Sequence, residues 1–255
     1  MGLKVCNIVP FFAPQFGGVV DRCYHITKEL ARRGHSVTLC TSDYQFDQNY
    51  ADTLNNVDIK VFNSFLGRFC ITPRLKSFLD VNATQFDVFH LMNNYSYVNV
   101  VSSRFCIENK IPYMYSAMGS LPIMSRSYFR KYIFNKSIGK IIVRNANILC
   151  AITEQEREQY MAYDKNVSST KIIKIQNAIE DPFDPSVSAS SFRHRFHIPP
   201  NCKIVLFVGR LEYVKGADLL IEAFARLHNN NPSIVLAIVG PDYGELTKLK
   251  DLIGK

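Results

Sequence analysis

Long apolar runs are missing from this sequence, and so is a charged-then-apolar segment at its start. The most apolar early stretch, residues 3–12, is too short to cross a bilayer and is interrupted by Asn7. We therefore expect a soluble, cytoplasmic protein. Its 255 residues are 47% apolar, which is enough for one large core or two smaller ones.

Closely spaced cysteine pairs are also missing. The seven cysteines are odd in number, widely scattered and never arranged as C-x-x-C. Neither a zinc site nor a disulfide framework is expected, and we predict no bound metal. Buried, reduced thiols in a cytoplasmic protein are the expected state. A G-x-G-x-x-G sequence is absent too, so the usual nicotinamide fingerprint fails.

Acidic residues are absent between Glu108 and Glu154, where basic and apolar side chains alternate. This combination suits the anionic inner face of a membrane or an acidic, lipid-linked substrate. An ordinary amphipathic helix with a basic solvent face explains the same pattern. Nucleic acid is not expected as a partner, because no recognised binding motif accompanies the charge. The basic residues are Lys110, Arg126, Arg130, Lys131, Lys136, Lys140 and Arg144, and the apolar ones are Tyr128, Phe129, Tyr132, Ile133 and Phe134.

Apolar stretches of strand length alternate with helix-length segments along the chain. This alternation predicts an α/β fold, in which Rossmann-like parallel sheets are covered on both faces. The first unit is a strand at 3–9, a loop rich in proline and glycine, a helix at 19–33 capped by Gly34, and a strand at 36–41. Further strands are predicted at 57–62, 87–91, 113–116, 148–152, 172–175, 204–208 and 234–239, and a last helix at 245–253.

The clearest functional signal lies in residues 204–224. Residues 204–208 are apolar throughout, as in a buried parallel strand; Gly209 ends the run, and apolar side chains then recur at helical spacing. Arg210 and Lys215 therefore fall at the carboxyl end of a strand, where open α/β sheets bind ligands. Two cations beside a helix start suit an anion, best a diphosphate. The simpler alternative is that both are solvated surface charges.

The run F-V-G-R-L-E-Y-V-K-G-A-D-L-L-I-E-A-F, residues 207–224, resembles the donor-binding segment of the retaining GT-B glycosyltransferases of family 4. The usual form there is VGRL-x-x-x-KG-x-x-x-L-I-x-A. In that family the arginine and lysine hold the diphosphate of a nucleotide-sugar and offset charge on the leaving nucleoside diphosphate. The resemblance assigns these roles to Arg210 and Lys215, beside Gly209. No D-x-D sequence supports metal-dependent diphosphate binding. We therefore expect no cofactor, only a UDP- or GDP-linked sugar as donor substrate.

The start of the chain resembles the same family. A loop ending in Gly17-Gly18 precedes a helix that ends L-A-R-R-G-H-x-V and is followed by a strand. In the family the paired glycines border the cleft and face the donor phosphate or the acceptor. A flexible turn without a ligand is the alternative for these glycines.

Four further residues are candidates for lining the cleft. His90 lies at the end of a predicted strand, although a lone histidine there is more often structural. The stretch Y-M-Y-S-A-M-G-S-L, residues 113–121, resembles the family segment in which a strand ends in a His-Gly or Arg-Gly pair near the sugar. Here Met118 precedes Gly119, so that polar contact is missing. Ser116 or Ser120 would have to replace it.

Thr153 and Glu156 have the spacing of a capping box at a helix start. We interpret the glutamates of this helix as structural residues, stabilised by the helix dipole, and assign them no chemistry.

Residues 181–191, rich in proline, serine and aspartate, are the predicted linker. Residues 1–184 would form an acceptor-side Rossmann-like domain, and residues 185–255 part of a nucleotide-sugar-binding domain. The resemblance implies that this second domain is incomplete, because the family continues for roughly another hundred residues. That part carries the E-x(7)-E motif and the glycine-rich segment that bind ribose, base and sugar.

The resemblance predicts a hexosyltransferase-type enzyme that transfers a sugar, with retention, to a glycan or a lipid-linked acceptor. Cell-surface polysaccharide biosynthesis, at the inner membrane face, is the expected setting. Two alternatives remain open. A truncated, non-catalytic homologue would retain a phosphate site or partner another chain, and a nucleotide-sugar epimerase would share the GT-B architecture.

Overall fold

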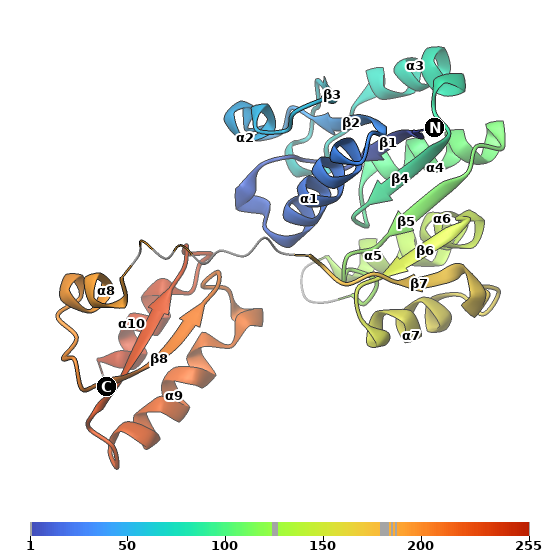
Figure 1. The fold of residues 1–255 in the computed structure, drawn as a ribbon. Helices are drawn as coiled ribbons and strands as arrows, with labels where there is room; N and C mark the ends of the chain where they lie inside the picture. Colours follow the sequence, from blue (N-terminus) through green and yellow to red (C-terminus); the bar gives the residue numbers. More distant parts are fainter. Residues whose placement is uncertain (1, 124–126, 179–183, 185, 187, 255) are drawn as a thin grey trace. The chain divides into compact units, whose positions relative to one another are not determined.

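The computed structural model describes residues 2–123, 127–178, 184, 186 and 188–254, and the chain forms two compact units, 1–180 and 181–255 (Figure 1). The predicted domain boundary is between residues 184 and 185, and residue 185 lies outside the described ranges. The predicted linker lies partly outside them as well, and its last three residues belong to helix α8 (Ala189–Arg195).

Unit 1 is a seven-stranded sheet with the order β3-β2-β1-β4-β5-β6-β7, and every neighbouring pair is parallel. The predicted strands are all present, with ends that shift by one residue at most. They are β1 (Lys4–Ile8), β2 (Ser36–Ser42), β3 (Val57–Phe62), β4 (Val88–Met92), β5 (Tyr113–Ser116), β6 (Ile148–Ala151) and β7 (Ile172–Lys174).

Helices connect successive strands of this sheet (Figure 1). Helix α1 ends as predicted: Gly34 has a φ of 85°, and the N–H groups of Gly34 and His35 donate to the carbonyls of Ala31 and Leu30. The helices are α1 (Gly18–Arg32), α2 (Gln48–Asp52), α3 (Pro73–Asn82), α4 (Tyr97–Asn109), α5 (Tyr128–Phe134), α6 (Lys140–Asn145) and α7 (Glu154–Tyr163). A π-helical turn, Asn135–Gly139, joins α5 to α6.

The core of unit 1 packs around the central strands and includes large aromatic side chains. Tyr113, Tyr115 and Tyr160 are almost completely buried, and each hydroxyl is hydrogen-bonded. The Tyr113 hydroxyl donates to the Ile142 carbonyl and that of Tyr115 to the Asn94 amide oxygen. These bonds offset the cost of burying polar groups. All seven cysteines are free thiols, as expected, and six of them are buried.

Unit 2 is smaller. Strands β8 (Lys203–Val208) and β9 (Ile234–Val239) are parallel, and helices α9 (Ala217–His228) and α10 (Leu246–Ile253) pack on them. The buried apolar side chains of its core cluster belong to Leu211, Ala217, Ile221 and Leu249. Both units therefore show the predicted α/β class, in which parallel strands alternate with helices. Among the described helices, none has the length and apolar character needed to cross a membrane.

Candidate functional site

The loop after β8 is held in place by the end of β9 and the loop that follows it. The N–H of Gly209 donates to the Val239 carbonyl at 2.9 Å, and that of Leu211 donates to the Pro241 carbonyl at 2.9 Å. Arg210 lies between these two anchors. The structure thus confirms that Arg210 follows the carboxyl end of a parallel strand, where ligands of α/β sheets bind.

Lys215 belongs to a single 3-10 turn, residues 213–215, that leads into α9. Gly216 follows with a φ of 66°, a left-handed conformation that glycine adopts without strain. The Lys215 side chain is exposed, and within the described ranges its ammonium group forms no ion pair or hydrogen bond. It is therefore a cation available to a ligand at the start of a helix, whose dipole also favours an anion.

Arg210 is held more firmly than Lys215. Its guanidinium carbon lies 4.9 Å from the centroid of the Tyr243 ring, and Nη2 lies 3.1 Å from the Glu212 carboxylate. That carboxylate oxygen nevertheless has no hydrogen-bond partner, so the ion pair is not aligned as a hydrogen bond. The ring and the carboxylate orient the guanidinium, and its N–H donors stay available for an anion.

The predicted glycine loop of unit 1 is open. Gly17 has a φ of 69°, and an added Cβ at Gly17 or Gly18 would meet no atom within 4 Å. The fifteen-residue helix α1 begins here, so its first N–H groups lie beside this space. This geometry allows a ligand to approach the backbone closely, and the role of the two glycines stays a prediction.

His90 and Ser116 are brought together across β4 and β5. His90 Nε2 lies 2.8 Å from Ser116 Oγ, and the two residues are only 5% and 1% exposed. Burial, and then the nearby Arg22 charge, lowers the pKa of His90 to about 3, so the imidazole is neutral at physiological pH. Both side chains are therefore almost closed to solvent, and the structure does not expose them to a substrate.

Gly119 and Ser120 belong to the loop after β5, which α7 holds in place. The Gly119 N–H donates to a Glu156 carboxylate oxygen at 2.7 Å, and the Ala117 N–H donates to the Tyr160 hydroxyl at 2.8 Å. The Ser120 hydroxyl bonds the Ala117 carbonyl. Gly119 is exposed and Ser120 half-buried, so both can be reached from solvent.

The interpretation of Glu156 from the sequence was incomplete. Thr153 Oγ1 does accept the Glu156 N–H at 3.1 Å, as a capping box requires. The Glu156 carboxylate, however, accepts from the N–H groups of Ile152 and Gly119, both at 2.7 Å, and the residue is only 3% exposed. Glu156 therefore ties the start of α7 to the loop after β5 and positions predicted site residues.

Matches to family models decide the family. Residues 16–181 match the model of Glycosyltransferase Family 4, and residues 189–255 match that of Glycosyl transferases group 1. The chain belongs to glycosyltransferase family 4. The resemblance drawn from the V-G-R-L and Gly17-Gly18 segments is thereby confirmed.

Two curated relatives extend along most of this family 4 chain. A D-inositol 3-phosphate glycosyltransferase of Corynebacterium diphtheriae is 23% identical over 246 residues, 88% of this chain and 56% of that protein. The phosphatidylinositol N-acetylglucosaminyltransferase GPI3 subunit of Saccharomyces cerevisiae is 23% identical over 262 aligned residues, 94% of this chain and 53% of that protein. The family 4 chain thus spans little more than half the length of these relatives.

Solved structures share the fold. Anabaena Alr3699/HepE, in complex with UDP and glucose, matches with a TM-score of 0.73 and 18% identity, over 98% of this chain and 64% of that one. The catalytic domain of starch synthase IV from Arabidopsis thaliana, bound to ADP and acarbose, has a TM-score of 0.69 and 15% identity, over 100% and 71%. The predicted GT-B fold is confirmed.

Arg22 is a residue of the family 4 chain that the sequence did not single out. It is 3% exposed, and Nη1 donates to the Ile175 carbonyl at 2.9 Å and to the Asn177 amide oxygen. Its Nε and Nη2 atoms lack partners among the described atoms, and burial lowers its pKa. Arg22 therefore fixes the segment after β7 to α1, the helix that begins at the open glycine loop.

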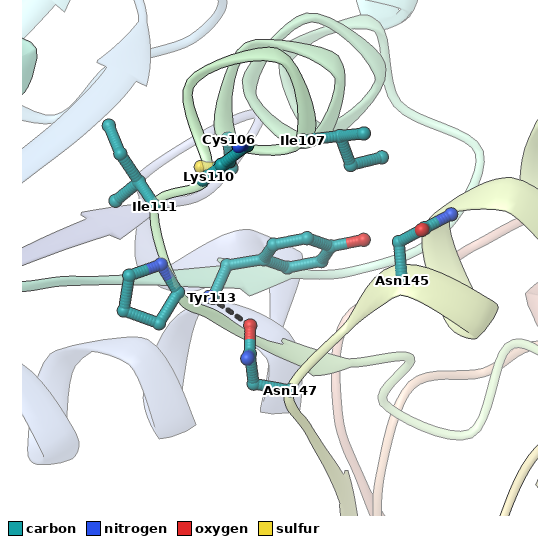
Figure 2. Close-up of a pocket in the computed structure, with 8 residues that line it drawn as sticks. Cys106, Ile107, Lys110, Ile111, Tyr113, Asn145 and Asn147 are labelled. Carbon is teal, nitrogen blue, oxygen red and sulfur yellow. Dashed lines mark hydrogen bonds between the residues drawn. The ribbon is translucent and has the colours of Figure 1, made fainter.

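One cavity of about 300 Å³ lies away from all these residues (Figure 2). Tyr113, at the beginning of β5, donates its N–H to the amide oxygen of Asn147, which precedes β6, at 3.0 Å. The cavity thus lies at the amino ends of the strands, and the carboxyl ends are at the opposite edge of the sheet. It forms no part of the candidate site.

Proposed function

We propose that this chain holds the acceptor-side domain and the first part of the donor domain of a retaining glycosyltransferase. The enzyme would transfer a hexose-type sugar from a nucleotide-diphosphate-sugar to a glycan or lipid-linked acceptor. The observation that carries the proposal is the pair of cations after β8: Arg210 oriented by Tyr243 and Glu212, and Lys215 without a partner in the described part of the chain.

These cations would act on the leaving group. The diphosphate would lie against Arg210 and Lys215, where charge grows as the bond to the sugar breaks. Cations fixed at that position stabilise the transition state more than the ground state. Within unit 1, the acceptor would lie beside Gly17 and Gly18, where the backbone is open.

The relatives support particular substrates. The HepE structures contain UDP, UDP-glucose or UDP with glucose, which favours a UDP-linked donor for this chain. The names of the curated relatives include inositol 3-phosphate and phosphatidylinositol, which favours an acceptor with a phosphorylated or lipid-linked polyol. A lipid-linked acceptor would place the reaction at the inner membrane face, in the synthesis of cell-surface glycans.

An epimerase is the second candidate, because a UDP-N-acetylglucosamine 2-epimerase structure matches with a TM-score of 0.61 at 12% identity. That likeness concerns the fold alone. The V-G-R-L and K-G residues around Arg210 and Lys215, together with the two glycosyltransferase family matches, favour sugar transfer. A non-catalytic module, the third candidate, would bind the nucleotide-sugar without transferring its sugar.

The donor site is tested by titrating UDP and GDP into the wild type and Lys215→Ala by calorimetry. A charge-assisted contact contributes about 1.5–3 kcal/mol, so the variant should bind about ten- to a hundredfold more weakly. The matched control is Lys203→Ala, an exposed lysine at the amino end of β8, which should bind like the wild type. Equal affinity in the wild type and Lys215→Ala would remove Lys215 from the site.

A further inference from the structure

Helix α5 is one element of unit 1 whose apolar side chains are not all covered by other described residues. Phe129 is 72% exposed, Tyr128 63% and Ile133 50%. An ordinary amphipathic helix buries its apolar side. The amphipathic helix considered above for the segment between Glu108 and Glu154 therefore does not explain why these side chains are exposed. Phe134 and Lys131 of this helix are half-buried against Tyr95, and the other five residues of α5, both charged and apolar, are exposed.

Cations surround these apolar side chains. Arg130 is exposed and has no ion pair within the described ranges, while Lys136 Nζ lies over the Tyr132 ring, 5.6 Å from its centroid. The π turn and α6 contain no acidic residue, and Asp164, which pairs with Arg144 of α6, is only 2% exposed. The exposed charge of the α5 surface is therefore positive.

The loop after β3 is the second element. Phe65 is 51% exposed, Leu66 64% and Phe69 53%, with the exposed Arg68 among them. The loop is not loose, because Phe65 and Ile71 exchange both backbone hydrogen bonds and Cys70 is fully buried. Leu66 adopts a φ of 62°, which is uncommon for leucine, and its side chain is held in solvent.

Both elements lie at the same edge of the sheet. The loop 63–71 follows the carboxyl end of β3, and it is tied to the loop after β2 where the Ser64 N–H donates to Asp43 at 2.8 Å. Helix α5 follows β5 and packs on the loop after β4, with the Phe134 and Tyr95 ring centroids 5.2 Å apart. The carboxyl ends of parallel strands form one edge, which also carries the open Gly17-Gly18 loop.

We propose that α5 and the loop 65–69 dock this edge of unit 1 on an anionic lipid bilayer. Basic and aromatic side chains on one surface suit the interface, where rings enter the headgroup region and cations meet acidic lipids. The purpose given to the docking rests on the proposed function: it would bring a lipid-linked acceptor to the Gly17-Gly18 loop. The surface itself is independent of catalysis.

The test measures sedimentation of the intact protein with phosphatidylcholine vesicles, with and without phosphatidylglycerol, at low and high salt. We expect binding to the anionic vesicles only, and release by salt. Because each basic residue near the surface contributes about 1 kcal/mol, Arg130→Gln with Lys136→Gln should weaken partitioning about 30-fold. The control pair, Lys203→Gln with Arg226→Gln, removes two exposed cations of unit 2 and should bind like the wild type.

The apolar contribution is tested by Phe129→Ser with Ile133→Ser, and separately by Leu66→Ser with Phe69→Ser. Each pair is exposed, so the fold should persist, and each should lower vesicle binding. The docking would be overturned if the protein bound no vesicles, or bound neutral and anionic vesicles equally. It would also be overturned if the variants bound like the wild type, or if a dimer buried these residues. Calorimetry with UDP on the same samples separates the two ideas: UDP binding without vesicle binding overturns the docking alone, and the reverse result overturns the donor site alone.

Discussion

Removing the charge of Glu156 should loosen the loop that carries Gly119 and Ser120. The carboxylate accepts two backbone N–H groups at 2.7 Å, from Gly119 and Ile152, in a position that is almost closed to water. Glu156→Gln keeps the shape of the side chain but replaces one acceptor oxygen with a donor. One N–H would then remain buried without a partner.

The expected loss in the free energy of unfolding is about 2–4 kcal/mol, because a bond to a charged group contributes about 1.5–3 and its neutral replacement is weaker. The measurement is urea unfolding followed by far-UV circular dichroism. Glu154→Gln is the matched control, since Glu154 lies in the same helical turn with its side chain 56% exposed. Its pairs with Arg157 and Lys174 are on the surface, and their loss should change stability by less than about 1 kcal/mol.

The two variants together decide the role of Glu156. Equal stability of Glu156→Gln and Glu154→Gln would refute the argument that the buried carboxylate holds the loop after β5. A loss confined to Glu156→Gln supports it. Faster amide exchange at Gly119 in that variant would locate the change in the loop.

Two further predictions concern pH and backbone packing. His90 has a pKa of about 3 when folded and 6.5 when unfolded, so the unfolded state alone gains its proton between these values, and stability falls as the pH is lowered. Between pH 7 and pH 5, His90 should lower the free energy of unfolding by about 2 kcal/mol, measured by urea unfolding. This contribution should be absent in His90→Gln, and the same pH dependence in both proteins would contradict the argument. Gly240→Ala should disrupt unit 2, because its Cβ would lie 1.8 Å from the Gly209 carbonyl oxygen. Gly244→Ala, whose Cβ meets nothing within 4 Å, should lower the thermal midpoint far less, and equal midpoints would refute this reasoning.

The strands could be predicted because their signals are local. Apolar residues in a run or in alternation with polar ones gave β3, β5 and β9 with the observed bounds, and Gly34 marked the end of α1. The loop with Arg210 and Lys215 was found in the same way, since glycine, both cations and the following helix are adjacent in the chain.

The contacts that position unit 1 residues could not be predicted, because they join distant parts of the chain. Glu156 bonds Gly119, which is 37 positions earlier, whereas the T-x-x-E spacing reports only the local cap. Arg22 reaches Ile175 across 153 positions. The sequence left the exposure of Phe129 open, between a membrane-facing segment and an ordinary amphipathic helix, and it gave no sign that Leu66 is exposed.

The most direct test of the proposed transferase is donor turnover by the protein isolated from its own cells. UDP-glucose and GDP-linked sugars would be incubated with it and with a lipid extract of those cells, and nucleoside diphosphate release measured. The account predicts release that requires the extract, that falls sharply in Arg210→Ala and Lys215→Ala, and that gives a product with the donor's anomeric configuration by NMR. Release that is unchanged in both variants, or no release from any donor, would contradict it.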